Sequence, residues 1–178
     1  SMTSPGMEFQ YQLTDDLERV EIIRGPQGNV GGVNASGGLI ALQTRRGRGP
    51  MSIEMGSEMG NYGSYKARFA IMGGDDKKDY YMGLTWFKTN GGMRATGLGT
   101  IDNNAYNNLS VVTNTGLRVL DGKAEIRDIF RFSRARKDIG INFHNDYPYT
   151  RSQAPYGNYG TNIDIMNVLS FDHNPTEL

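Results

Sequence analysis

Few side chains in this sequence have the types and spacing that catalysis or metal binding requires. The two histidines, His144 and His173, lie beside turn or loop residues, and neither has a second histidine or a carboxylate at metal-ligand spacing. The Asp75-Asp76 pair could supply half of a calcium site, but Lys77 follows at once and favours a solvated turn. Cysteine is absent, which excludes a disulfide framework, a thiol nucleophile and a thiolate metal site.

Groups for covalent or acid–base catalysis cannot be assembled from the sequence either. There is no Gly-x-Ser-x-Gly elbow, and no nucleophile, base and orienting group stand in a recognisable arrangement. No carboxylate pair suited to glycosidic chemistry stands out. We therefore expect a protein that is not an enzyme and that uses no metal or other cofactor.

The side chains best suited to ligand binding lie in a predicted loop over residues 147–161. Tyrosine rings beside arginine and asparagine suit stacking on a polar ligand and hydrogen bonding to it. The same residues also fill exposed β-loops that bind nothing, so both interpretations stay open. The candidate ligand residues are Tyr147, Tyr149, Arg151, Tyr156 and Tyr159.

A glycine-rich segment near the N-terminus separates two stretches with strand character. Val20 to Ile23 is rich in β-branched residues, and residues 39–44 indicate a second strand. Pro26 has no N–H for a strand ladder and restricts Gly25 to extended geometry, so the chain must turn there. Six glycines from Gly25 to Gly38 suit tight turns. The prediction is a strand, a compact loop with at most one helical turn, and a strand.

The glycine spacing could also indicate a nucleotide-binding loop, but two features of such loops are missing. A P-loop would need a Gly-Lys-Ser/Thr sequence, which is absent. A dinucleotide-binding fold would need a helix of several turns next, whereas residues 34–38 break a helix quickly. We therefore do not expect nucleotide binding.

Residues 17–44 read LERVEIIRGPQGNVGGVNASGGLIALQT and contain a long motif with tight spacing. The motif resembles the C-terminal end of the plug domain of TonB-dependent outer-membrane receptors. That family pattern reads roughly [VI]-E-R-I-E-[VI]-x-R-G-P, a spacer, Y-G, then A-x-G-G-x-I-x-[IL]-x-T. Residues 18–26 match without a gap, and Gly31 replaces the common tyrosine. The plug-motif residues are Glu21, Arg24, Gly25, Pro26, Gly32, Ala35, Gly37 and Gly38.

The resemblance implies a transporter in the outer membrane of a Gram-negative bacterium. In this family a barrel of about 22 strands holds the plug in its lumen. The implied activity is energy-coupled uptake of a scarce nutrient of the siderophore, cobalamin or glycan type. The implied partners are outer-membrane lipid, a small-molecule nutrient ligand and a TonB-type energy transducer. We expect the segment that engages the transducer, and the first half of the plug, to have no counterpart in this sequence.

Composition agrees with an all-β chain. Twenty-four glycines and ten tyrosines suit many short connections between strands. The 19 basic and 19 acidic residues balance, and no long basic run is present, so we expect no nucleic-acid partner. No apolar run reaches the roughly 20 residues of a membrane helix. A strand crossing a bilayer needs only about ten residues that are apolar on one face.

From residue 51 onward, apolar and polar residues alternate with the period of two that strands require. Residues 51–55, 65–71 and 80–87 are predicted strands, and further strands are predicted over 106–119, 124–143 and 162–171. Aromatic residues near both ends of the 80–86 set are typical of the girdles at two membrane interfaces. Asp128 falls among apolar residues, so either it lies near an interface or a bulge shifts the register there.

Short and long connections alternate along the chain. Turns are predicted at 73–78, 172–177 and 120–123, the last with the favoured Asp121-Gly122 pair. Long polar loops are predicted at 89–105 and 147–161. This asymmetry is typical of transmembrane barrels, but it is incomplete here because the first outer connection, Gly60 to Ser64, is short. A soluble β-sandwich can also mix loop lengths.

Together these observations predict an all-β fold: an antiparallel hairpin meander, part of a transmembrane β-barrel, preceded by the end of an α/β plug domain. Residues 1–48 would be the C-terminal part of the plug, and residues 49–178 the first six or so barrel strands, with 45–50 as the hinge. We expect a fragment of a longer receptor, because six strands cannot close such a barrel and open edges leave unpaired backbone groups. The alternative is a soluble all-β binding module that recognises carbohydrate or a protein partner through the tyrosine-rich loops.

Overall fold

The computed structural model describes residues 13–25, 38–91, 93–94, 100–101, 105–139 and 158–173. Every regular element in this part of the chain is a β-strand, and all the strand pairs are antiparallel. The prediction of an all-β antiparallel fold is therefore confirmed. No helix in these residues is long and apolar enough to cross a membrane.

The glycine-rich segment forms a hairpin. Strand β1 (Leu17–Arg24) pairs with β2 (Gly38–Thr44), and Ile22 lies opposite Ile40. These are the two strands predicted from the sequence. The loop between them lies outside the described residues.

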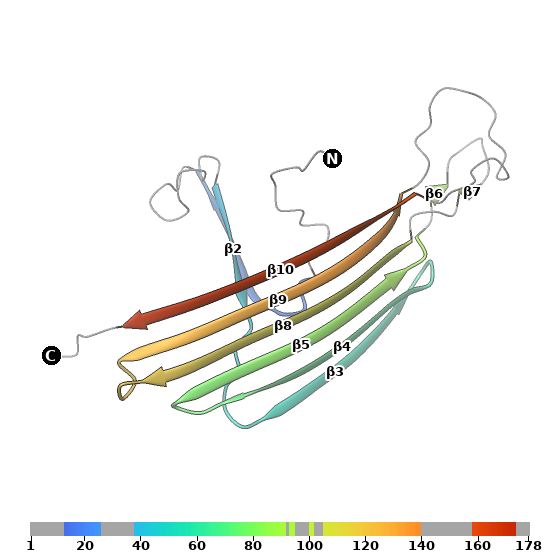
Figure 1. Cartoon of the computed structure of the whole chain (residues 1–178). Coiled ribbons are helices and arrows are strands. Elements are labelled where there is room, and N and C mark those ends of the chain that lie inside the picture. Colours follow the sequence, from blue (N-terminus) through green and yellow to red (C-terminus); the bar gives the residue numbers. More distant parts are fainter. Residues whose placement is uncertain are drawn as a thin grey trace.

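Six longer strands form one sheet in the order β10-β9-β8-β5-β4-β3. They lie side by side in a curved sheet, with the β1–β2 hairpin on one side of it (Figure 1). Two very short strands, β6 (Met93–Arg94) and β7 (Thr100–Ile101), pair between β5 and β8. The six strands are β3 (Ser52–Gly60), β4 (Ser64–Gly74), β5 (Lys78–Thr89), β8 (Tyr106–Val119), β9 (Ala124–Ile139) and β10 (Asn158–His173).

The last strand begins earlier than the sequence suggests. Residues 158–161, predicted to belong to a loop, are the start of β10 and pair with residues 136–139 of β9. Their glycine, asparagine and tyrosine content is typical of loops, but the neighbouring strand supplies backbone partners that override this local preference.

Two connections use left-handed backbone at residues other than glycine, the β3–β4 turn at Tyr62 and the β8–β9 turn. The β8–β9 turn has positive φ at Leu120 and Asp121 as well as Gly122, and the amide of Gly122 donates to the carbonyl of Val119 at 3.2 Å. The turn lies where it was predicted, but its left-handed part begins one residue before the Asp-Gly pair. The β4–β5 turn has a different stabilising feature. The side chain of Asp75 accepts hydrogen bonds from the backbone amides of Lys77 and Lys78, as is common in exposed turns.

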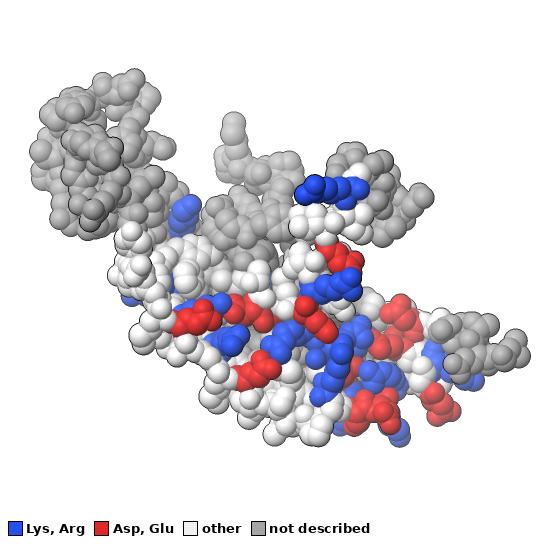
Figure 2. All heavy atoms as spheres, turned by 180° about the vertical axis from the view of Figure 1, so that it is seen from behind, with Lys and Arg blue, Asp and Glu red and all other residues white. Residues whose placement is uncertain are grey.

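The six-stranded sheet has one apolar face and one charged face. Ile53, Phe69, Leu84 and Ile165 project from the face away from the hairpin, here called the outward face, and all four are exposed. Acidic and basic side chains gather on the opposite face, here called the charged face, which Figure 2 shows. A small cluster of buried apolar side chains also lies on the charged face: Ala70, Met72, Tyr81 and Val112.

Asp128 lies on the outward face without any irregularity of the strand. It is opposite Thr115 of β8 and Leu169 of β10, and both registers run through it unbroken. The predicted alternative of a bulge at this position is therefore wrong. One oxygen of the carboxylate accepts a hydrogen bond from the side-chain amide of Asn167 at 2.8 Å.

Candidate functional site

The segment that joins the hairpin to the sheet, residues 45–50, is here called the connector. It runs against the charged face and is held there by hydrogen bonds at both ends. The side-chain amide of Asn114 donates to the carbonyl oxygens of Arg45 at 3.1 Å and Thr44 at 3.4 Å. The backbone amide of Gly74 donates to the carbonyl of Gly49 at 2.8 Å. The predicted hinge is thus fastened to the sheet.

Gly47 brings the connector into direct contact with the sheet backbone. A Cβ atom at this position would lie 2.1 Å from the carbonyl oxygen of Tyr80 and 2.2 Å from that of Gly73. Real Cβ atoms do not approach other atoms so closely, so any side chain would push the connector off the sheet. Glycine is the residue that permits this packing.

Arg45 fixes the beginning of the connector to β3. Its two terminal nitrogens donate to the two carboxylate oxygens of Glu54, each at 2.9 Å. The guanidinium carbon also lies 5.5 Å from the centre of the buried Tyr81 ring, a favourable cation–π distance. The hydrogen bonds to Glu54 stabilise the cation and raise the pKa of Arg45, so its charge is permanent.

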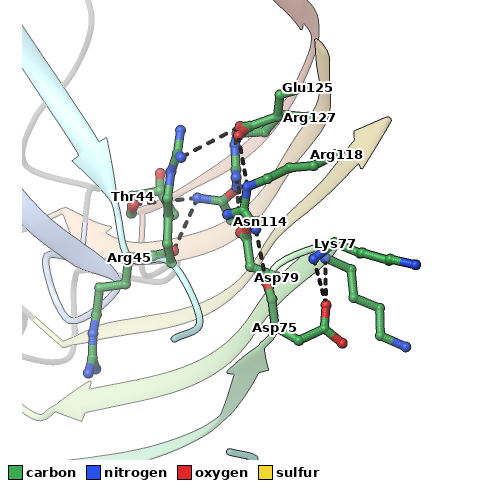
Figure 3. Close-up of polar contacts among 11 residues, drawn as sticks. Thr44, Arg45, Asp75, Lys77, Asp79, Asn114, Arg118, Glu125 and Arg127 are labelled. Atoms are coloured by element: carbon green, nitrogen blue, oxygen red, sulfur yellow. Dashed lines mark hydrogen bonds and ion pairs between the residues drawn. The ribbon is translucent and has the colours of Figure 1, made fainter. Parts of the chain in front are cut away.

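A second group of charges lies beside the connector and is here called the anchoring cluster: Asp79, Asn114, Arg118, Glu125 and Arg127 (Figure 3). Its centre is a row of residues in lateral register across three strands. Asp79 of β5 is opposite Gly116 of β8, and Gly116 is opposite Arg127 of β9.

The Arg127 side chain crosses β8 at this glycine to reach Asp79. Its Nη1 and Nη2 donate to the two carboxylate oxygens of Asp79, each at 2.9 Å. A Cβ atom on Gly116 would lie 2.3 Å from Nη2, so a side chain there would displace the guanidinium. Both ionic partners are almost fully buried, and the fork-like pairing is the geometry that makes such a contact strong.

Asn114 joins this ion pair to the connector. Its side-chain oxygen accepts a hydrogen bond from Nη1 of Arg127 at 2.6 Å, while its nitrogen donates to the connector carbonyls. The side-chain amide of Asn114 therefore hydrogen-bonds the Arg127 guanidinium with its oxygen and the connector backbone with its nitrogen.

Glu125 and Arg118 are the remaining members of the anchoring cluster. Glu125 accepts from Nε of Arg127 at 2.6 Å and lies 3.5 Å from Nη1 of Arg46 in the connector. Arg118 donates to Asp79 at 2.9 Å and to the carbonyl of Asp75 at 2.9 Å. Connector and three strands thus share one ionic network.

Residues just before β1 make further ion pairs with the charged face. Asp16 pairs with the buried guanidinium of Arg131, and its carbonyl accepts a hydrogen bond from the amide of Arg45 at 2.9 Å. Asp15 lies 2.6 Å from the ammonium of Lys66. Burial raises the pKa of Asp16, and the nearby charge of Arg131 opposes this shift.

This arrangement is suited to holding one segment of chain against another. Within the residues that the structure describes, no group of three histidine, aspartate or glutamate side chains could hold a metal ion. The charged groups point at one another and at backbone carbonyls, so their roles in the described part of the chain are positional.

The plug-motif residues that the structure describes belong to the hairpin. Glu21 is in β1 and pairs with Arg19 at 2.8 Å. Arg24 ends β1, and Gly25 follows it with a φ of 100°. Gly38 begins β2, and a Cβ atom there would lie 2.6 Å from the carbonyl of Ile23. Four motif residues lie outside the described part of the chain: Pro26, Gly32, Ala35 and Gly37.

Of the candidate ligand residues, the structure describes Tyr159 alone. Tyr159 lies in β10 on the outward face, and its ring centre is 4.2 Å from the guanidinium carbon of Arg136. Tyr147, Tyr149, Arg151 and Tyr156 fall outside the described residues.

Sequence reasoning did not single out the anchoring cluster. The available signals were the placement of Glu125, Arg127 and Arg131 on one strand face and the glycine at position 116 inside a strand pattern. The pairing of Arg127 with Asp79 could not be inferred, because it depends on the register of strands that are distant in sequence.

Comparisons with known proteins add no identification. No family model matches the chain, and no solved structure matches it. What bears on function is therefore the plug motif and the geometry of the sheet.

Proposed function

We propose that this chain is part of a TonB-dependent outer-membrane receptor, comprising the end of the plug and the first six barrel strands. In this role it contributes to energy-coupled uptake of a scarce nutrient of the siderophore, cobalamin or glycan type. The observation that carries the proposal is the division of the sheet into an exposed apolar face and a charged face that holds the motif-bearing hairpin.

The outward face has the character of a surface in contact with lipid. Large apolar side chains are exposed on both edge strands, including Met59 of β3 at 84 % and Leu169 and Phe171 of β10 at 70 % and 63 %. Isolated exposed apolar residues are normal, but a continuous apolar patch over six strands indicates a membrane or protein partner. An outward apolar band opposite a polar interior is the pattern of a transmembrane barrel.

The strands are long enough for this role. Strand β8 has 14 residues, and β9 and β10 have 16 each. A tilted strand needs about 9–11 residues to cross the hydrocarbon core of a bilayer. The strands of this sheet could therefore cross it and extend beyond.

The two edges of the sheet support a larger barrel. Within the described residues, β3 pairs on one side with β4, and β10 pairs on one side with β9. Unpaired backbone groups in lipid cost several kcal/mol each, so a barrel would supply neighbouring strands at both edges.

The anchoring cluster then has a defined part in transport. It ties the connector to the inner wall of the barrel just after the plug ends. Rearrangement of the plug would either leave residues 45–49 in place or have to break the hydrogen bonds of Arg45 to Asn114 and Glu54.

Trp86 allows a direct test, because it is the sole tryptophan of the chain and lies on the outward face. We would compare its fluorescence in dodecyl maltoside micelles and in micelles of the same detergent with brominated chains. The proposal predicts strong quenching by bromine and weak quenching by iodide in the water phase.

A matched variant places the reporter on the other face. Trp86→Phe combined with Phe87→Trp moves the indole by one residue, which turns it towards the charged face. Bromine should quench this variant weakly. Equal bromine quenching in both proteins, or a compact monomer that sediments identically without detergent, would favour the soluble binding module instead.

A further inference from the structure

Asp128 is a carboxylate among apolar side chains of the outward face. Along β9 it lies between Ile126 and Phe130, which share its face, and Leu169 of β10 is directly opposite it. Ile126 and Leu169 are both exposed. A charge on an apolar face that meets lipid is unfavourable unless a group of opposite charge accompanies it.

Basic side chains in the described part of the chain do not supply that opposite charge, because none of them forms an ion pair with Asp128. Through β8, Lys78 of β5 is in register with Ile126. Strands are spaced by about 4.8 Å and residues by about 3.4 Å, so the backbone positions of Lys78 and Asp128 are roughly 12 Å apart. His173 is at the end of β10, four residues beyond Leu169.

Three hydrogen-bond acceptors from adjacent strands lie together here. One oxygen of Asp128 accepts from the side-chain amide of Asn167 at 2.8 Å, and the other has no partner in the described chain. Thr115 of β8 is directly opposite Asp128, where paired Cβ atoms are about 4.5–5.5 Å apart. The Thr115 hydroxyl and the side-chain oxygen of Asn167 likewise have no partner in these residues, and both side chains are exposed. Asp128, Thr115 and Asn167 are here called the acceptor group.

The acceptor group lies towards the end of the sheet where the connections are short. Tyr80 of β5 is opposite Thr115, and Lys78, the next residue of β5 on the same face, directly follows the β4–β5 turn. Tyrosine collects where a membrane meets water, since its ring is amphipathic. The acceptor group is therefore within reach of lipid headgroups if the outward face contacts lipid.

We propose that the acceptor group binds the primary ammonium of a lipid headgroup of the ethanolamine type. This inference rests on the proposed function, because it needs the outward face to contact lipid. A primary ammonium has three N–H donors, one for an oxygen of each residue in the group, and its charge complements the carboxylate. A choline headgroup has the same charge but no N–H donor, so the acceptor group favours the ethanolamine lipid.

The test compares two lipids that differ in the ammonium alone. The double substitution W86F/F130W moves the sole tryptophan beside the acceptor group, because Phe130 is two residues from Asp128 on the same face. The chain is placed in mixed micelles of dodecyl maltoside and unbrominated phosphatidylcholine. A small, equal mole fraction of brominated phosphatidylethanolamine or of brominated phosphatidylcholine is then added. We expect the ethanolamine lipid to be enriched beside the indole by about fivefold, the factor that a favourable exposed ion pair supplies.

Two substitutions with the same change of charge, each added to W86F/F130W, separate this site from net charge. D128N keeps the size of the side chain but removes the carboxylate, and it should abolish the enrichment. D121N removes a carboxylate from the exposed turn at the same end of the sheet and should leave the enrichment unchanged. A D128N protein that keeps the enrichment, or equal loss in both proteins, would overturn the inference.

The wild-type chain gives a second measurement if a substituted protein does not fold. It is passed through micelles that hold both unbrominated lipids in equal amounts, and the lipid that it retains is identified by native mass spectrometry. We expect an excess of phosphatidylethanolamine, and equal retention would overturn the inference. Phosphoethanolamine in solution at the same concentration should not displace the lipid, and displacement would contradict a lipid site by pointing to a site for soluble amines.

The quenching results also separate this inference from the proposed function. Absence of quenching by brominated phosphatidylcholine as well as by the ethanolamine lipid would contradict the proposed function itself. Equal quenching by the two lipids would contradict this inference alone, and would leave the acceptor group to a basic side chain of a protein partner.

Discussion

Two neighbouring residues of β9, Arg127 and Asp128, have charged side chains in very different surroundings on the two faces of one sheet. Arg127 points to the charged face, is 3 % exposed and donates hydrogen bonds to Asp79, Asn114 and Glu125. Asp128 points to the outward face and has a neutral hydrogen-bond partner, Asn167, among apolar neighbours. On the charged face, burial is accompanied by opposite charges; on the outward face, charged side chains are few among the described residues.

This contrast indicates that the two faces meet different surroundings. Two opposite charges can stay buried where each has its partner and its remaining hydrogen bonds, as Arg127 and Asp79 have beside the connector. An apolar face of similar extent indicates that a membrane or another protein covers it. Substitutions on each face should therefore have different effects on stability.

Removing the central cation of the charged face should have the largest effect. Arg127→Leu leaves the Asp79 carboxylate buried with only Arg118 beside it, and breaking one side of a buried pair costs roughly 3–5 kcal/mol. The measurement is urea unfolding in detergent, followed by Trp86 fluorescence. Arg19→Leu is the control, since Arg19 is in an exposed pair whose expected contribution is about 0–1 kcal/mol. The double variant D79L/R127L should recover part of the loss, and no recovery would contradict the pairing.

Placing a charge on the outward face should have the next largest effect. Leu84 lies in the middle of β5, and an arginine at mid-depth on a lipid face costs about 2–4 kcal/mol. Leu84→Arg should therefore destabilise the detergent-bound protein by that amount. In Ile22→Arg the change falls on an exposed position of the hairpin, where about 0.5 kcal/mol or less is expected. Equal small effects in both variants would mean that the outward face meets water.

The packing of the connector should respond to a single methyl group. Gly47→Ala would place a Cβ atom within 2.2 Å of two carbonyl oxygens, and overpacking of this kind costs roughly 1–3 kcal/mol. Gly60→Ala is a suitable control, because its Cβ atom would meet Ser64 at an ordinary 3.5 Å. Unfolding midpoints in urea would show the difference, and a Gly47→Ala protein as stable as the control would contradict the tight contact.

The smallest effect concerns pH and has opposite signs at two carboxylates. Burial raises the pKa of Asp16, so the native state binds its proton more readily and stability from this group falls as pH rises above about 3.8. Backbone hydrogen bonds lower the pKa of the exposed Asp75, so its contribution is lost as pH falls below about 3.8. The free energy of unfolding of wild type, relative to that of Asp16→Asn, should fall between pH 4 and 7. The corresponding difference for Asp75→Asn should stay constant over the same range. A flat profile for both would contradict the burial of Asp16.

Much of the strand layout could be predicted from local patterns, because the period of two decides which residues share a face. Strand β8 has the bounds expected from the sequence, and the apolar set of β5 lies on one face as predicted. The start of β10 was missed because Asn158 to Thr161 have loop composition. That stretch is a strand because β9 extends far enough to pair with it.

The site was less predictable than the fold for a physical reason. A charged residue that alternates with apolar ones indicates a polar face, but not its partner. Arg127 reaches Asp79 because three strands stand in one register and the middle one has Gly116 at the crossing point. Register between strands that are distant in sequence is set by the whole sheet, so no local motif encodes it.

The location of Trp86 shows whether the outward face contacts lipid while the opposite face holds the connector. Bromine on the detergent chains should quench Trp86 strongly and should quench an indole moved to position 87 weakly. If both positions are quenched alike, or if Trp86 is reached by iodide and not by bromine, the outward face meets water and the receptor assignment is wrong.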